Sequence, residues 1–368
     1  MRIKNARLFP TAPTFGRTPQ GDWFLSVILK ATFRLENRLT PARLAEKQLP
    51  ILTTDEPYDP KKPEGALRFE SELVPFKPRT DVLLVGQAHA PFGRPQKYVD
   101  VTMLVGPVGK QIRVFGERRW SFKDLRDPMP LVAGPVEFVE MPLTWDRAFG
   151  GIDEQAGTRP DVPAFRPWYS ANFIGKGFSG ARTIESIDER PLPNLEDPRD
   201  PIRSWDTRPR PAGCGYFPRN SEPRVRYGGT YDEKWKAERA PLLPLDFCFD
   251  YYNAADPELQ VQGYLQGNER GMLENVTPGG GRIDFLLPCI RPRFRVTRGT
   301  EPAKRYVTEA SAALDTVVLI PEFKTFTVIW RAVIAPCVPE DNDVEEVWIA
   351  YEKLQPAPPP EQRGWVRA

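Results

Sequence analysis

The sequence predicts an all-β protein with few short helices, built as an antiparallel β-sandwich or as two packed β modules wrapped by an irregular layer. About ten short segments have strand patterning, whereas only one or two suit a helix. Proline accounts for 42 of the 368 residues, roughly twice its usual share, which argues against long uninterrupted helices. No strand–helix–strand alternation is visible, so a parallel α/β sheet is not expected.

The clearest strand patterns lie near the start of the chain. Residues 23–35 alternate apolar and polar side chains, which predicts a long strand with one buried and one solvated face. Residues 81–90 are an apolar run, and Gly86 within it is the expected site of a bulge. Residues 98–105 and 111–115 flank the five residues GPVGK and predict a hairpin with a five-residue loop.

Residues 134–153 concentrate interface-type side chains in one short segment, GPVEFVEMPLTWDRAFGGID. Trp145, Arg147 and Phe149 are residue types enriched at protein interfaces. The alternative is that the two aromatic side chains are core plugs, because large aromatic residues are mostly buried. The glycine pair 150–151 indicates backbone with positive φ or a close approach between chain segments.

Residues 154–230 carry little periodic patterning but many proline, arginine and aromatic residues. We expect them to wrap the β core as an irregular layer, because disordered segments are poor in aromatic side chains. Trp168, Tyr169 and Trp205 in this layer are further candidates for contact with a partner.

Strand patterns return in the last third of the chain, after a short helix. Thr230 and Glu233 have the spacing of a capping box, so a helix is predicted over residues 231–239. Pro292 predicts that one of the later strands is an edge strand. The predicted strands are 282–287, 290–296, 317–320, 325–334 and 344–351.

Chain order divides these predictions into sub-modules. The N-terminal β module is 1–153, the irregular wrapping segment is 154–245, and the C-terminal β module is 246–355. A flexible, proline-rich tail at 356–368 follows.

Charge and cysteine usage restrict the partners. The net charge of +2 gives no global attraction to nucleic acid or to a membrane surface. No apolar run approaches the roughly 20 residues of a membrane span, and the first residues lack the apolar core of a secretory signal. The four cysteines show no C-x-x-C spacing, so neither a zinc site nor a redox pair is predicted. We expect a reduced, cytoplasmic protein that binds no metal, nucleic acid or membrane.

Catalytic patterns are weak. Residues 175–180, GKGFSG, match the G-x-G-x-x-G of dinucleotide-binding loops, but no clear strand precedes them and no clear helix follows. A sugar- or nucleotide-acting enzyme that uses this loop is one alternative, and a flexible glycine loop is the other. His89 is the single histidine and is expected to be structural, since no nucleophile elbow accompanies it. We assign no catalytic residue and no cofactor, and we expect a protein without enzymatic activity.

An ordered set of short motifs resembles the domain of unknown function 2169 (DUF2169) family and covers most of the chain as a single domain over 1–368. The match departs from the family pattern at 172–177 and 214–217. The motifs are TDVLLVGQAHAP (80–91), VFGERRW (114–120), FVEMPLTWDRAFGG (138–151), LPNLEDP (192–198), GGTYDEKWKAERAPLLPLDF (228–247) and LPCIRP (287–292).

The resemblance implies a bacterial, cytoplasmic accessory protein of the type VI secretion system. Such a protein is a non-enzymatic adaptor or chaperone that binds an effector, often one with a PAAR-like tip domain, and promotes its loading onto the VgrG spike. An alternative is a structural component exported with the spike. The family motifs mark a set of structural residues: Met141, Pro142, Gly150, Gly151, Thr230 and Trp235.

Overall fold

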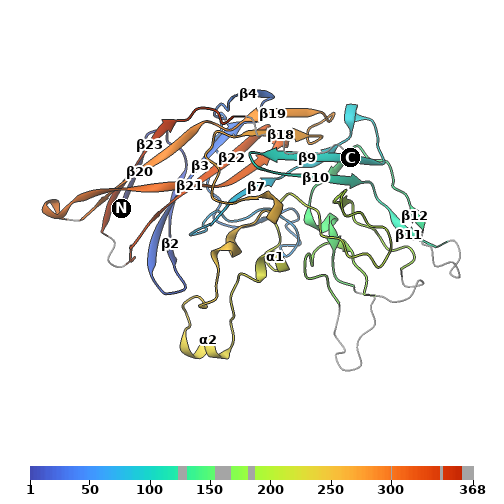
Figure 1. The fold of residues 1–368 in the computed structure, drawn as a ribbon, viewed down its shortest axis with the longest axis horizontal. Helices are drawn as coiled ribbons and strands as arrows, with labels where there is room; N and C mark the ends of the chain where they lie inside the picture. Colours follow the sequence, from blue (N-terminus) through green and yellow to red (C-terminus); the bar gives the residue numbers. More distant parts are fainter. Residues whose placement is uncertain (123–130, 154–166, 181–186, 300, 340–342, 359–368) are drawn as a thin grey trace.

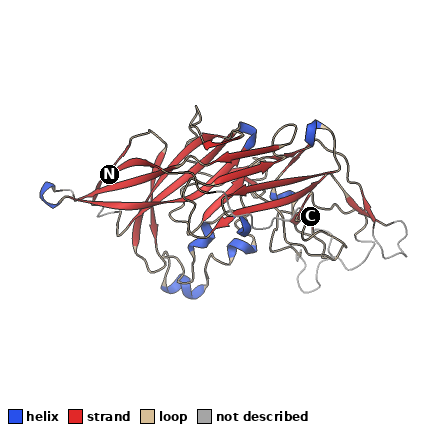
Figure 2. Cartoon of the chain, turned by 45° about the horizontal axis from the view of Figure 1, so that its top comes forward, coloured by secondary structure: helices blue, strands red, loops and turns tan. Residues whose placement is uncertain are grey.

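The computed structural model describes residues 1–122, 131–153, 167–180, 187–299, 301–339 and 343–358. Strands dominate these residues and only two short α-helices occur among them, so the all-β prediction is confirmed. Figure 2 shows the strands as the body of the molecule and the helices as small additions at its periphery.

The larger sheet has nine strands and combines the start and the end of the chain. Its main path runs β1-β23-β20-β21-β22-β3-β2, and β7 and β17 join it beside β21. In Figure 1 the blue N-terminal strands accordingly lie among the orange and red C-terminal ones. The bounds are β1 (Arg2–Asn5), β2 (Thr11–Arg17), β3 (Trp23–Arg34), β7 (Thr80–Leu84), β17 (Gln260–Val261), β20 (Ile290–Arg298), β21 (Tyr306–Ile320), β22 (Thr325–Ile334) and β23 (Val344–Lys353).

The smaller sheet has six strands in the order β16-β10-β9-β18-β19-β4. Both sheets contribute to one hydrophobic core. At one contact between them, the rings of Phe285 on β19 and Phe326 on β22 lie 5.7 Å apart. The bounds are β4 (Arg38–Pro41), β9 (Tyr98–Val105), β10 (Val108–Phe115), β16 (Leu195–Glu196), β18 (Arg270–Glu274) and β19 (Arg282–Leu286).

Short strand pairs and single helical turns complete the described fold. The pairs are β5 (Glu56–Pro57) with β6 (Leu67–Phe69), β8 (Gln87–His89) with β13 (Glu140–Pro142), β11 (Arg119–Ser121) with β12 (Leu131–Ala133), and β14 (Phe149–Gly150) with β15 (Lys176–Gly177). The helices are α1 (Glu222–Val225) and α2 (Glu233–Glu238), and the 3-10 turns are η1 (Pro91–Gly93), η2 (Trp145–Arg147), η4 (Phe249–Tyr252), η5 (Pro257–Leu259), η6 (Pro302–Lys304) and η7 (Pro321–Phe323).

Strand β3 is covered on both faces, so the prediction of one solvated face is wrong. Its polar side chains are buried with partners: the Lys30 ammonium lies 2.6 Å from the Glu72 carboxylate and donates to the Pro50 carbonyl at 2.8 Å. An alternating pattern shows which residues share a face, but it does not show whether a loop covers the polar face.

Two of the predicted connections differ from the structure. The 81–90 run forms two strands, β7 and β8, which enter different sheets on either side of Val85 and Gly86. The β9–β10 hairpin is tighter than predicted, because Val105 pairs directly with Val108 and leaves a two-residue turn.

Strand β20 is internal, so its prediction as an edge strand is wrong. It pairs with β23 on one side and with β21 on the other. The pairing with β21 begins at Arg293, one residue after Pro292, so the proline need not donate a hydrogen bond to that neighbour. Arginine side chains along β20 are paired with acidic ones: Arg293 binds Glu352 at 2.7 Å and Arg298 binds Asp343 at 2.8 Å.

The sub-modules drawn from chain order do not correspond to separate sheets. Both sheets contain strands from 1–153 and from 246–355, because β3 pairs with β22 and β9 pairs with β18. The described part of the wrapping segment is irregular, as expected, and contributes buried residues such as Tyr216 and Phe217 to the common core.

Helix α2 lies within the predicted range, but its cap is not the predicted one. The Asp232 carboxylate accepts from the Trp235 amide at 2.7 Å and is the N-cap. Thr230 instead binds Asp246 through both its amide and its hydroxyl, at 3.0 and 2.7 Å. The Trp235 indole donates to the Leu242 carbonyl at 2.9 Å and closes the turn after the helix.

Candidate functional site

Residues 134–153, which we call the signature segment, fold inward at Trp145. This residue is 1% exposed, its ring centroid lies 4.1 Å from that of Phe217, and its indole nitrogen donates to the Gly215 carbonyl at 3.1 Å. Phe149 is also buried, and its ring lies edge-on to Tyr169 at 5.0 Å. A partner surface cannot reach either side chain in this conformation. We therefore assign both to core packing, which was the alternative to an interface role.

The glycine pair of the signature segment lies where two parts of the chain cross, residues 148–153 and residues 167–178. Met141 and Pro142 pair with β8 through β13. Gly150 has φ 146°, and a Cβ on it would lie 2.0 Å from the Asn172 carbonyl oxygen. Gly151 has φ 102° and donates to the same carbonyl at 2.8 Å. Only glycine permits this approach, so these glycines serve the crossing of the two segments.

Arg147 belongs to a small ion cluster at the edge of this crossing. Its guanidinium lies 3.1 Å from Glu117 and donates to the Asn194 side-chain oxygen at 3.1 Å. Lys176, from the glycine loop, binds the other Glu117 oxygen at 3.0 Å. Burial alone would raise the pKa of Glu117, but the hydrogen bonds and charges of Lys176 and Arg147 outweigh it and lower that pKa.

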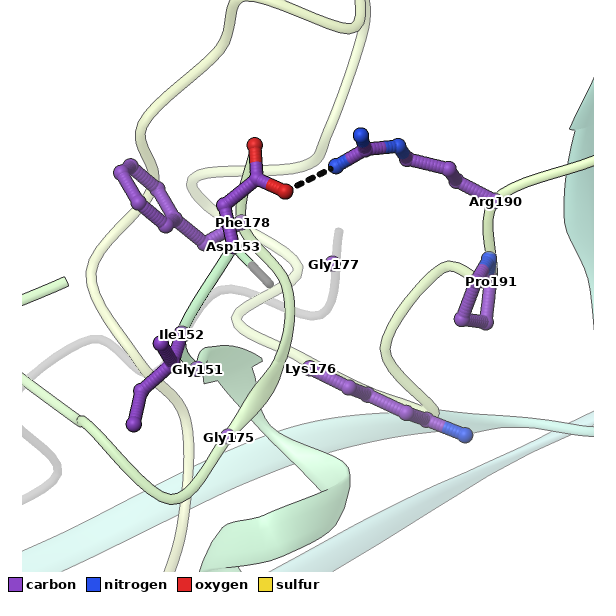
Figure 3. Close-up of a pocket in the computed structure, with 10 residues that line it drawn as sticks. Gly151, Ile152, Asp153, Gly175, Lys176, Gly177, Phe178, Arg190 and Pro191 are labelled. Atoms are coloured by element: carbon purple, nitrogen blue, oxygen red, sulfur yellow. Dashed lines mark hydrogen bonds and ion pairs between the residues drawn. The ribbon is translucent and has the colours of Figure 1, made fainter. Parts of the chain in front are cut away.

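A pocket of about 250 Å³ opens between the two crossing segments. Residues 150–153 and 175–178 form its walls, together with Arg190 and Pro191 (Figure 3). Asp153 is buried and holds Arg190 through its Oδ1 atom, 2.8 Å from Nη1. The Asp153 Oδ2 atom accepts from the Gly180 amide at 2.8 Å.

Arg190 is only partly satisfied. Its Nη1 atom contacts Asp153 and also donates to the Ser179 hydroxyl at 2.9 Å. Its Nε and Nη2 atoms are buried and have no hydrogen-bond partner within the part of the chain that the structure describes. Buried polar groups are normally paired, so the hydrogen bonding of Arg190 is incomplete among the described residues.

The predicted contact residues outside the signature differ in exposure. Trp168 is 56% exposed and pairs through its backbone with Ile152, which is also exposed, at the rim of the pocket. Tyr169 is half-buried, and its hydroxyl donates to the Pro209 carbonyl at 3.2 Å. Trp205 packs against a small second cluster that includes Trp120. Of the predicted aromatic contact residues, Trp168 is therefore the most accessible.

Phe92 is a surface aromatic residue that the sequence interpretation missed. It lies in η1 with φ 58° and is 85% exposed. Its amide donates to the Gly279 carbonyl at 2.8 Å, and the Gly93 amide donates to the Ala90 carbonyl at 3.1 Å. We call residues 91–94 the Phe92 loop. A Pro-Phe-Gly sequence directly after a strand was the available signal, because it predicts a tight turn that displays its middle residue.

Three features of the described residues bear on the predictions about metal binding and catalysis: the metal-ligating side chains, the single histidine and the glycine loop. No group of three or more His, Cys, Asp and Glu side chains in the described ranges could hold a metal ion. The single histidine, His89, is buried with Nδ1 3.4 Å from Glu140, and burial lowers its pKa despite that carboxylate. Residues 170–174, directly before the glycine loop, form turns and irregular backbone and no strand. Residues 181–186, where a helix would have to follow, lie outside the described residues.

Comparison with protein families gives one match. A family model described as an uncharacterized protein conserved in bacteria (DUF2169) matches residues 20–331. Neither the curated proteins nor the solved structures include a match. Among the described residues, no helix is long and apolar enough to cross a membrane.

Proposed function

The chain belongs to the DUF2169 family of uncharacterized bacterial proteins, and we propose that it is a cytoplasmic adaptor or chaperone of the type VI secretion system. In this role it binds and stabilises an effector, such as a toxin with a PAAR-like tip domain, and promotes its loading onto the VgrG spike. The biological setting of the proposal comes from the sequence resemblance, and its binding chemistry comes from the surface of the molecule.

The outward display of Phe92 is the observation that carries the proposal. A residue with a side chain at positive φ costs roughly 1 kcal/mol, and a ring that is 85% exposed gains little from burial in the core. The backbone hydrogen bonds of the Phe92 loop nevertheless hold the ring outward. Aromatic anchors that are already ordered lose little entropy on binding, so they dominate many protein interfaces.

A second feature supports binding of a protein. Trp168 and Ile152 are exposed together beside the pocket, and a Trp next to an aliphatic side chain suits the core of an interface. Trp168 and Ile152 lie where residues 167–178 cross residues 148–153. Backbone hydrogen bonds hold this crossing, such as that from the Tyr169 amide to the Gly151 carbonyl at 2.9 Å.

The first test is capture of the partner from the native cytosol with a tagged protein, followed by mass spectrometry. We expect recovery of one large effector linked to a PAAR-like or VgrG protein, whose cellular level falls when the adaptor gene is deleted. Recovery of no such partner would contradict the proposal. Recovery of the protein itself outside the cell, together with the spike, would favour the exported structural component instead.

The Phe92→Asn variant makes the test specific. Asparagine tolerates positive φ, so we expect the fold to remain while affinity for the captured effector falls roughly 30-fold, the equivalent of about 2 kcal/mol for an anchor residue. Leu8→Asn is the matched control, because Leu8 is 89% exposed, has φ 56° and lies between β1 and β2. Equal binding by the two variants would remove the Phe92 loop from the interface.

A further inference from the structure

We propose that residues 305–309, at the open edge of β21, pair with the same residues of a second copy of this chain and form an antiparallel, two-fold symmetric dimer. The inference goes beyond the adaptor function and does not rest on it, because it concerns a part of the molecule that the Phe92 loop does not include. It depends on the open backbone edge, on the exposure of its side chains and on the way its charges complement each other.

The first part of β21 is an open sheet edge. Residues 306–311 pair with β20 on one side, whereas pairing with β22 on the other side begins only at Ala312. Among the described residues, no strand pairs with 306–311 on that second side. Every second residue of the segment therefore directs its N–H and C=O groups away from β20 with no strand to receive them. Figures 1 and 2 show β20 and β21 extending as a hairpin past the other strands, with η6 at its tip.

Both faces of this segment are uncovered. Tyr306 is 52% exposed, and Val307, on the opposite face of the strand, is 62% exposed. The next two residues, Thr308 and Glu309, are exposed as well. The described residues therefore leave room for another strand to lie beside this edge.

The edge lacks the features that protect the two ends of the same sheet. Sheet edges are normally kept from pairing by proline, by charged side chains or by short length. At one end of the sheet β2 contains Pro13 and Gly16, and at the other end β1 has four residues, two of which are Arg2 and Lys4. Residues 306–311, YVTEAS, contain no proline or glycine and begin with three residues that favour strands.

The charges of this edge are complementary to themselves about Val307. In a two-fold antiparallel pair, residues at equal distances from the axis on the two strands lie opposite each other. With the axis at Val307, Arg305 of each copy lies opposite Glu309 of the other, and the two Val307 side chains meet. Opposite charges and apolar β-branched pairs both stabilise neighbouring strands. A shift of the register by two residues would place Val307 opposite Glu309 instead, so the charges select this axis.

Both charged groups have capacity for the second contact. Glu309 is exposed, and its ion pair with Arg295 of the same copy is long, at 3.9 Å. Arg305 binds Glu345 through its Nε and Nη2 atoms, at 2.7 and 2.8 Å. The Nη1 atom of Arg305 is therefore available to donate to a second carboxylate.

Sedimentation velocity tests the dimer directly. Two paired segments of five residues form a contact smaller than a standard stable interface, so we expect a Kd on the order of 10–100 µM. The wild-type protein should therefore be mostly dimeric at about 500 µM and monomeric at about 1 µM. A monomer at both concentrations would overturn the proposal, and that includes the case in which this edge receives a strand of a different protein.

Two charge-reversal variants show whether this edge forms the dimer. In Glu309→Lys and in Arg305→Glu, like charges face each other at both ends of the paired segment, so each variant alone should dimerise at least about tenfold more weakly than the wild type. In an equimolar mixture of the two variants, opposite charges face each other at both ends, and we expect the dimer to return. This recovery also shows that both variants are folded. Unchanged dimerisation of either variant alone, or no recovery in the mixture, would overturn the proposed pairing.

The Val307→Cys variant gives an independent readout at the symmetry axis. Opposite residues of an antiparallel pair have Cβ atoms about 4.5–5.5 Å apart, which is close to the spacing in a disulfide. We expect mild oxidation to link two copies of this variant. Val136→Cys is the matched control, because Val136 is also 62% exposed and lies outside the edge, and the wild type, with Cys248 half-buried, gives the background. Equal crosslinking of the two variants would overturn the two-fold axis at Val307.

Discussion

The indole ring of Trp145 fills the interior beside a segment more than sixty residues away in the chain. A Cβ on Gly213 would lie 2.7 Å from this ring, and the Gly215 carbonyl accepts its N–H at 3.1 Å. Residues 214–217 are also where the sequence departs from the family pattern that it resembles. The residues that depart from the pattern therefore pack directly against Trp145, so we expect the departure to affect core packing.

Replacement of Trp145 by alanine tests this packing role. We expect Trp145→Ala to lower the free energy of unfolding by about 3–5 kcal/mol, because a large cavity forms and a buried carbonyl loses its donor. Leu245→Ala, at a position that is 67% exposed, should change it by no more than about 0.5 kcal/mol. Urea denaturation of both variants makes the comparison, and similar losses would contradict the assignment of Trp145 to the core.

At the scale of elements, helix α2 shows how closely spaced polar residues compete for the same role. Thr230 and Asp232 both precede the helix, and both are favoured N-cap residues. Asp232 caps the helix, while Thr230 binds Asp246, which follows the helix in the chain. Figure 1 places α2 at the end of a projecting segment, away from the sheets.

The cap can be tested locally. Removal of the Asp232 carboxylate in Asp232→Ala leaves the Trp235 amide without its acceptor at 2.7 Å, which should cost about 1 kcal/mol. We therefore expect hydrogen exchange at that amide to become roughly fivefold faster. Thr230→Ala is the control and should leave the Trp235 amide protected. Faster exchange at the Trp235 amide in Thr230→Ala alone would instead support the capping box that the sequence predicts.

At the scale of the whole molecule, buried ion pairs connect the sheets with the irregular layer. Lys110 on β10 and Asp256 are both buried and lie 2.8 Å apart, and Arg210 of the wrapping segment binds the same aspartate at 2.7 Å. Arg224 of α1 similarly binds Glu70, which lies between β6 and β7. A charged group of this kind is expensive to bury unless its partner is present.

The Lys110→Met variant measures what this connection contributes. We expect the free energy of unfolding to fall by about 2–4 kcal/mol, because Asp256 stays buried while Arg210 compensates only part of its charge. Arg282→Met, which removes an exposed pair with Asp284, should cost no more than about 0.5 kcal/mol. Calorimetry of the two variants provides the measurement, and an equal loss would show that the buried pair has no special weight.

The sequence by itself determined the fold class and several elements. Residues 325–334 were predicted as a strand and form β22 with the same bounds, and a short helix was predicted around α2. These features depend on neighbours in the chain, because side-chain alternation and capping are local properties. The same local signals identified residues 134–153 as an unusual segment before any contact of its residues was known.

Only the tertiary structure decided which faces are buried, how the strands are ordered and which side chains meet. Trp145 is core and Phe92 is surface because of segments far away in the chain, which cover the first and leave the second uncovered. The Arg190 guanidinium is held by Asp153, which lies 37 residues earlier in the chain. Burial and pairing are properties of contacts between distant residues, so no local pattern contains them.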